Sequence, residues 1–155
     1  MNTPMAEEER NVEIMRRWFD GGVYGAPSTE AGDAYIDEHY AKDGRAYGLG
    51  NQFVEGPAPF KAFRDAFVGA FSDLTFDMKH CFAKGDLVTL YWEASAVARA
   101  TGQPLAFAGG GIVRMKNGQI VEAWNLVNFH DLLEQLGEVP EGAILTAFDK
   151  QAKHA

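Results

Sequence analysis

The chain has 155 residues, enough for one compact domain, and 46% of them are hydrophobic, which excludes a disordered chain. Its 14 basic and 22 acidic residues give a net charge of −8 without any cluster of lysine or arginine, which argues against binding to nucleic acid or to an anionic membrane. No apolar stretch approaches the ~20 residues of a membrane span, and the acidic N-terminus lacks a secretion signal, so we expect a soluble cytoplasmic protein.

Helical spacing of apolar residues marks the first part of the chain. Thr3-Pro4 provides an N-cap and a first helical proline, and the helix is expected to run to about Asp20, where Gly21-Gly22 stops it. A second helix should begin at Ser28, and a third should follow Gly56-Pro57. The third helix carries a stripe of phenylalanines that we interpret as core: Phe60, Phe63, Phe67 and Phe71.

Alternating side chains mark the following part as strands. A short strand is predicted around Ala46 and Tyr47, before the third helix. From residue 74 one face of a longer strand should hold Leu74, Phe76, Met78, His80 and Phe82. Three more strands are predicted at Leu87–Val97, Leu105–Met115 and Ile120–Phe129, the last two joined by a hairpin turn. Within them, the glycines at 109–111 are typical of a bulge or a close approach of two backbones.

Two short segments complete the chain. The stretch "HDLLEQLG" predicts a helix that ends before Gly137, and the tail 138–155 could add one more helix through Ile144, Leu145 and Phe148. The absence of a repeat or linker predicts a single domain over 1–155, with its core at about 11–137. Helices followed by long strands predict an α+β fold, in which the helices pack on a highly curved antiparallel sheet.

Two amides interrupt the last predicted strand, in the stretch "WNLVNF". Asn125 and Asn128 should point to opposite faces of the sheet, because the side-chain period of a strand is two. A buried amide without partners costs ~1–3 kcal/mol, so each needs a role. We expect Asn128 to face a pocket and serve a ligand, and Asn125 to serve the sheet or a partner chain.

This order of elements, together with several sequence segments, resembles the SnoaL-like polyketide cyclase (ester cyclase) family. The similar segments are "YGLG" at 47–50, "EGPAPFKAFRDAFVGAFSDLTF" at 55–76, "AKGDLV" at 83–88, "GQIVEAWNLVNF" at 118–129 and "LLEQLG" at 132–137. The resemblance implies the cone-shaped, cystatin-like barrel fold of nuclear transport factor two and ketosteroid isomerase. It further implies a concave sheet closed by helices around an apolar pocket, usually in a dimer.

The resemblance also indicates where chemistry would lie. Typical members carry an Asp four residues after the tryptophan of the last strand, as a general acid/base, and the matching residue here is Asn128. An amide can hydrogen-bond an enolate oxygen but cannot transfer a proton near neutral pH. Tyr47 stands where the family often has His, and Tyr91 where it tends to have Arg. Most of the residues that transfer protons in typical members of the family are therefore absent from this chain.

His80 is the predicted base, since the alternation places it on an apolar face and burial would keep its imidazole neutral. The alternative is a core histidine satisfied by a hydroxyl or a backbone carbonyl. Tyr47 and Tyr91 could donate to an oxyanion, and Glu93 could face a pocket, the solvent or a subunit interface. Each of these three could equally be structural.

The tryptophans are predicted either to line a ligand cavity or to fill the core: Trp18, Trp92 and Trp124. The histidines lack metal-ligand spacing, the single Cys81 excludes a cysteine-based zinc site, and no cofactor is expected.

Three functions stay open. The first, which we favour, is an enzyme that isomerises, cyclises or dehydrates a small apolar carbonyl compound, with His80 as base and Tyr47 and Asn128 holding the enolate oxygen. The second is a small-molecule binder without proton chemistry, and the third is an interaction protein. The last strand is apolar on both faces, which predicts a homodimer.

Overall fold

The computed structural model describes residues 4–50 and 53–153, and it contains helices followed by a long-stranded sheet. The predicted N-cap at Thr3 lies outside the described residues. The elements in chain order are α1 (Pro4–Arg17), η1 (Trp18–Gly22), α2 (Thr29–His39), β1 (Tyr40–Tyr47), β2 (Val54–Glu55), α3 (Pro57–Gly69), β3 (Phe71–Lys84), β4 (Leu87–Ala98), β5 (Pro104–Lys116), β6 (Gln119–Asn125), α4 (Phe129–Gln135) and α5 (Ala143–Ala152).

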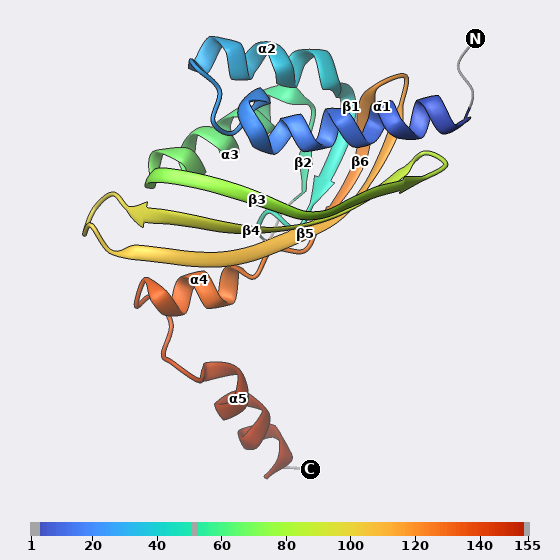
Figure 1. The fold of residues 1–155 in the computed structure, drawn as a ribbon. Helices are drawn as coiled ribbons and strands as arrows, with labels where there is room; N and C mark the ends of the chain where they lie inside the picture. The colour runs from blue at the N-terminus through green and yellow to red at the C-terminus, as the bar shows by residue number, and fades with distance from the viewer. Residues whose placement is uncertain (1–3, 51–52, 154–155) are drawn as a thin grey trace.

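One six-stranded sheet in the order β2-β1-β6-β5-β4-β3 forms the centre of the molecule. Neighbouring strands are antiparallel except β1 and β6, which are parallel. Helices α1, α2 and α3 cover the concave face, while α4 lies against the opposite face (Figure 1). The α+β, cone-shaped architecture predicted from the sequence is therefore confirmed, although the sheet stays open at β2 and β3 instead of closing into a barrel.

Local signals place the helices much as predicted. The Ser28 hydroxyl caps α2 by accepting a hydrogen bond from the Ala31 N–H at 3.1 Å. The first helix continues past Arg17 as the π-helical turn η1, which brings Trp18 into the core. The third helix ends at Gly69, so the expected membership of Phe71 in its stripe is wrong. Phe71 instead begins β3, where its buried ring meets the edge of Phe67 at 5.1 Å.

A β-bulge in β3 corrects the predicted face of His80. Met78 pairs with Trp92 but His80 pairs with Tyr91, so Lys79 is an extra residue on the β3 side. Beyond the bulge, Cys81 turns toward the helices while His80 is exposed on the outer face, as is Phe82 after it. The predicted apolar face is correct for Leu74, Phe76 and Met78 only.

The last strand ends earlier than predicted, which changes the position of Asn128. Strand β6 stops at Asn125, and Asn128 is the exposed N-cap of α4. Its side-chain oxygen accepts from the Asp131 N–H at 3.1 Å, and its backbone N–H donates to Ala108 at 2.9 Å. Asn128 therefore starts a helix on the outer side of the sheet, where it borders only a shallow surface hollow, and it does not line the cavity between the helices and the sheet, which corrects the prediction.

Three glycines of β5 allow the sheet to bend sharply. Gly111 has a φ of +153°, and a Cβ there would overlap the backbone carbonyl oxygen of Trp124 on β6. A Cβ on Gly110 would overlap the carbonyl oxygen of Leu90 on β4, and one on Gly109 would lie 2.8 Å from the Trp92 ring. The predicted close approach of backbones is confirmed, because only hydrogen fits at these positions.

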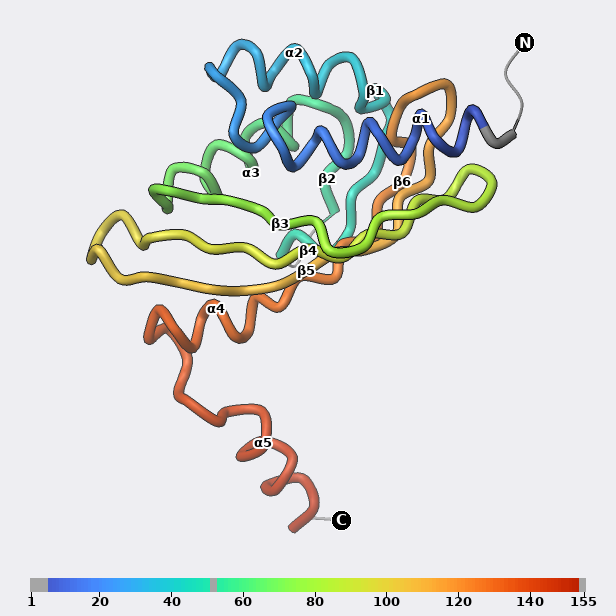
Figure 2. Tube along the Cα trace, in the orientation of Figure 1, coloured from blue at the N-terminus to red at the C-terminus, as the bar shows by residue number. Residues whose placement is uncertain are grey.

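The tail contains the helix expected there, but the helix lies apart from the rest of the chain. Helix α5 extends away from the body below α4 (Figures 1 and 2). Its three large apolar side chains, Ile144, Leu145 and Phe148, are all exposed. Among the residues that the structure describes, no helix is long and apolar enough to cross a membrane.

A buried arginine joins two of the covering helices. Arg64 of α3 is only 4% exposed, and its guanidinium donates hydrogen bonds to Asp33 of α2 and, at 2.7 Å, to Asp65. The hydrogen bond from Arg64 is the main reason why the pKa of Asp33 lies below its usual range. A lowered pKa in the folded state means that the ionised form is preferentially stabilised by folding.

We therefore expect part of the stability to depend on ionised Asp33. This contribution should be complete above the ordinary carboxyl pKa of about 3.9 and should be lost as the pH falls through the lower pKa of the folded state. Urea unfolding between neutral pH and about pH 3 should show a weaker loss on acidification for Asp33→Asn than for the wild type. Asp43→Asn removes the same charge from an exposed position and should keep the wild-type acid dependence. Parallel acid profiles for Asp33→Asn and the wild type would contradict this role of Asp33.

Candidate ligand-binding site

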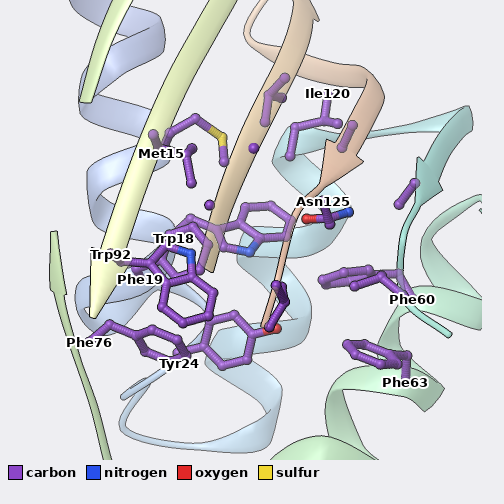
Figure 3. Close-up of a pocket in the computed structure, with 18 of the residues that line it drawn as sticks. Met15, Trp18, Phe19, Tyr24, Phe60, Phe63, Phe76, Trp92, Ile120 and Asn125 are labelled. Carbon is purple, nitrogen blue, oxygen red and sulfur yellow. The ribbon is translucent and has the colours of Figure 1, made fainter. Parts of the chain in front are cut away.

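A cavity of about 70 Å³ lies between the helices and the concave face of the sheet. Aromatic side chains from the helices and from β1, β3 and β4 surround it (Figure 3). The aromatic residues in its lining are Trp18, Phe19, Tyr24, Tyr40, Phe60, Phe63, Phe67, Phe76, Trp92 and Phe129. An engineered cavity of about 150 Å³ holds benzene, so a ring can enter here only if some of these side chains move.

The aromatic walls pack on one another across different elements. Phe76 of β3 meets Trp92 of β4 edge to face at 4.8 Å, and Phe19 of η1 lies 5.8 Å from Trp92. On the other side, Trp18 lies 5.5 Å from Phe60 of α3. These contacts give the cavity wide, flat, apolar surfaces that suit a planar ligand.

Asn125 supplies a polar atom to this apolar cavity. Its Nδ2 donates a hydrogen bond to the backbone carbonyl of Tyr47 on the neighbouring strand β1, at 2.8 Å. With the nitrogen held in this way, the side-chain oxygen is turned toward Trp18 (Figure 3). The cavity therefore contains an amide oxygen that accepts hydrogen bonds.

Tyr24 supplies the second polar atom of interest. Its side chain lies among Phe76, Phe67 and Phe19, and the residue is only 8% exposed. Among the described residues the Tyr24 hydroxyl has no hydrogen-bond partner, and Figure 3 shows it directed toward the side where Phe63 lies. Burial raises the pKa of Tyr24 well above its usual range, more than nearby Arg64 lowers it. The phenol is therefore neutral and can donate a hydrogen bond at any physiological pH.

The structure divides the residues predicted for the site between two faces. Trp18 and Trp92 line the cavity. His80 and Tyr91 lie together on the outer face with ring centres 6.2 Å apart, as do Tyr47 and Trp124 at 6.3 Å, and Glu93 is exposed there near Lys79. The predicted set of His80, Tyr47 and Asn128 is thus not brought together in the cavity.

Two cavity residues were not predicted to face the cavity. The expected role of Asn125 in the sheet is confirmed by its hydrogen bond to Tyr47 on the neighbouring strand, but Asn125 also lines the cavity. Asn125 alternates with Ala123 and Val127, which also line the cavity, and this spacing could have indicated its face. Tyr24 follows an irregular turn after η1, and no local pattern indicates where its side chain points. Within 4–50 and 53–153, no group of three or more His, Cys, Asp or Glu side chains could hold a metal ion.

Comparisons with known proteins agree with this architecture. The family model described as "SnoaL-like domain" matches residues 15–123. A search of curated proteins found no match.

Solved structures extend the likeness over nearly the whole chain. A candidate SnoaL-like polyketide cyclase from Jannaschia sp. CCS1 is 21% identical, with a TM-score of 0.76 over 90% of this chain and 99% of that chain. AclR, a candidate hydroxylase from Streptomyces galilaeus, is 22% identical, with a TM-score of 0.73 over 95% and 94% of the two chains. An LEH-like epoxide hydrolase from M. tuberculosis is 12% identical, with a TM-score of 0.66 over 87% and 89%. These likenesses establish the fold, and the family model covers well over half of the chain. The chain therefore belongs to the SnoaL-like domain family.

Proposed function

We propose that the protein binds a small, uncharged, aromatic molecule in the cavity between the helices and the sheet. The observation that carries this proposal is the composition of the lining, in which aromatic rings predominate. Among the described lining residues no side chain is charged, and an ion without a partner would lose several kcal/mol of hydration there. The ligand should therefore enter in its neutral form.

The same lining favours binding over proton transfer by the protein. General acid/base catalysis requires a side chain whose pKa lies near the working pH, and the raised pKa of Tyr24 lies far from it. A cyclase, isomerase or lyase acting on a small carbonyl compound without a cofactor is the second candidate. Membership of the SnoaL-like family favours it, as does the Tyr24 hydroxyl, which could donate a hydrogen bond to a carbonyl oxygen.

The three tryptophans provide a direct test of binding. Two of them, Trp18 and Trp92, line the cavity, whereas Trp124 lies on the outer face against Tyr47. Adding 4-hydroxyacetophenone should shift the indole N–H NMR signals of Trp18 and Trp92 and leave that of Trp124 in place. No shift with any neutral aromatic compound, or a shift of Trp124 alone, would overturn the proposal. Chemical conversion of an added carbonyl or enone compound during the same titration would favour the enzyme.

We also expect a homodimer that buries the outer face of the sheet. Large apolar side chains are exposed there, including Leu126 at 71%, Tyr91 at 42% and Ile112 at 39%. Such a surface is unusual for a monomer and resembles the apolar part of an interface. Light scattering at micromolar concentration should give the mass of two chains, and the double variant Ile112→Glu/Leu126→Glu should give one. Ala34→Glu adds a negative charge on the exposed side of α2 and should leave the dimer intact. A monomeric wild type would contradict the prediction.

A further inference from the structure

Among the polar atoms of the cavity, the Asn125 side-chain oxygen and the Tyr24 hydroxyl differ in the hydrogen bonds that they can make. One N–H of the Asn125 Nδ2 group donates to the carbonyl of Tyr47, which fixes the amide, and its oxygen accepts hydrogen bonds. The Tyr24 residue is 8% exposed, its hydroxyl has no hydrogen-bond partner among the described residues, and its raised pKa keeps it protonated, so it can donate to a ligand. A ligand oxygen that reaches this hydroxyl would gain a hydrogen bond inside an apolar surrounding.

The positions of these atoms add a second constraint. Asn125 lies at the end of β6 near the parallel strand β1, between Ile120 and Phe60 in Figure 3. Tyr24 lies at the other end of the lining, next to Phe76 at 4.9 Å and Phe67 at 6.1 Å. Between the two ends lie the rings of Trp18, Phe19 and Trp92, which would cover the faces of a flat molecule (Figure 3).

We infer that the ligand is a neutral hydroxylated aromatic carbonyl compound, whose hydroxyl donates to the Asn125 side-chain oxygen and whose carbonyl oxygen accepts from the Tyr24 hydroxyl. This inference rests on the proposed binding function and specifies its ligand class. A ring with only one of the two polar groups would leave the other protein atom unpaired. A ring with a carboxylate would bring a charge into a lining where no described side chain can balance it.

The test compares ring compounds of similar size against the wild-type protein. The probes are 4-hydroxyacetophenone with both groups, acetophenone with the acceptor, 4-ethylphenol with the donor, and 4-ethylanisole with the donor methylated. Affinities are measured by NMR titration of the Trp18 and Trp92 indole signals at about pH 6, where the phenols are neutral. We expect 4-hydroxyacetophenone to bind about tenfold more tightly than acetophenone or 4-ethylphenol. We expect 4-ethylphenol to bind several-fold more tightly than 4-ethylanisole.

Two variants assign each hydrogen bond to its residue. Tyr24→Phe removes a single oxygen atom, and it should weaken 4-hydroxyacetophenone about tenfold while leaving 4-ethylphenol unchanged. Asn125→Leu should remove the preference for 4-ethylphenol over 4-ethylanisole. Asn125→Leu also removes the hydrogen bond to the carbonyl of Tyr47, which can weaken folding. The comparison of the four probes on the wild-type protein does not need this variant and therefore stays decisive.

The outcomes separate this inference from the function on which it rests. Absence of binding by all four neutral probes would overturn the proposed function itself. Equal affinity for all four would leave the binding function standing and overturn the inferred ligand class. Tighter binding of 4-hydroxybenzoate than of 4-hydroxyacetophenone would also overturn the class, because it would show that a charged group is accepted.

Discussion

Replacing Gly111 with alanine is expected to remove most of the stability of the fold. The new Cβ would overlap the carbonyl oxygen of Trp124 and lie 3.2 Å from the Cα of Asn125, and both atoms belong to the backbone of β6. Backbone atoms of a paired strand cannot move aside as a flexible side chain can, and the φ of +153° is strained for any L-residue. Overpacking and backbone strain together should cost on the order of 4 kcal/mol or more, a large part of the 5–15 kcal/mol typical of a domain.

Urea unfolding followed by circular dichroism measures this cost, and the yield of folded protein gives a second readout. Gly69→Ala is the matched control, because Gly69 is the last residue of α3 and a Cβ there would meet nothing within 4 Å. It should be neutral or should stabilise by up to about 1 kcal/mol, since alanine is the better helix former. A Gly111→Ala protein within 1 kcal/mol of the wild type would show that β5 and β6 can separate at little cost.

Trp92→Ala is expected to have the second largest effect, on stability and on binding together. The Trp92 ring is only 4% exposed, and it contacts Phe76 at 4.8 Å, Phe19 at 5.8 Å and Phe107 at 6.0 Å. Truncating a buried tryptophan costs about 3–5 kcal/mol, because transfer energy is lost and a void remains. This void adjoins the cavity and should enlarge it enough to admit a bicyclic ring.

Indole should therefore raise the melting temperature of Trp92→Ala in a concentration-dependent way and have little effect on the wild type. Trp124→Ala is the control, since Trp124 is only partly buried and stacks on Tyr47 on the outer face. It should cost less than Trp92→Ala and should gain nothing from indole. Equal losses in the two variants would argue against the division of the tryptophans between the two faces.

The elements of the fold were largely predictable because their signals are local. Ser28 caps α2, Gly137 follows α4, and the turn at 116–118 joins β5 to β6, each from chemistry within a few residues. The glycines of β5 were also correctly interpreted as a close approach of backbones. Helix boundaries were harder, and Phe71 shows why. A phenylalanine at helical spacing can equally begin the next strand when the helix ends two residues earlier.

The candidate site was less predictable because it depends on the side of the sheet that each residue faces. One extra residue at Lys79 reverses the alternation, so His80 is exposed although it stands in an apolar pattern. Asn128 was assigned to a strand, but an Asn three residues before Asp131 is also a favoured helix N-cap, and in the structure that role applies. Alternation with Ala123 and Val127 could have indicated the face of Asn125, but the way its amide is turned depends on a carbonyl 78 positions away, which no local pattern can indicate.

Helix α5 has a consequence for hydrogen exchange. A helix of ten residues is at best marginally stable by itself in water, and the large apolar side chains of α5 contact solvent. In an isolated chain its amides should therefore exchange with solvent deuterium almost as fast as those of an unfolded peptide, while the amides of β4 and β5 exchange only on global opening. Any surface that covers Ile144, Leu145 and Phe148 would slow exchange along α5 before it changed the rest of the molecule. The exchange rate of the α5 amides would therefore report the binding of this helix to another molecule.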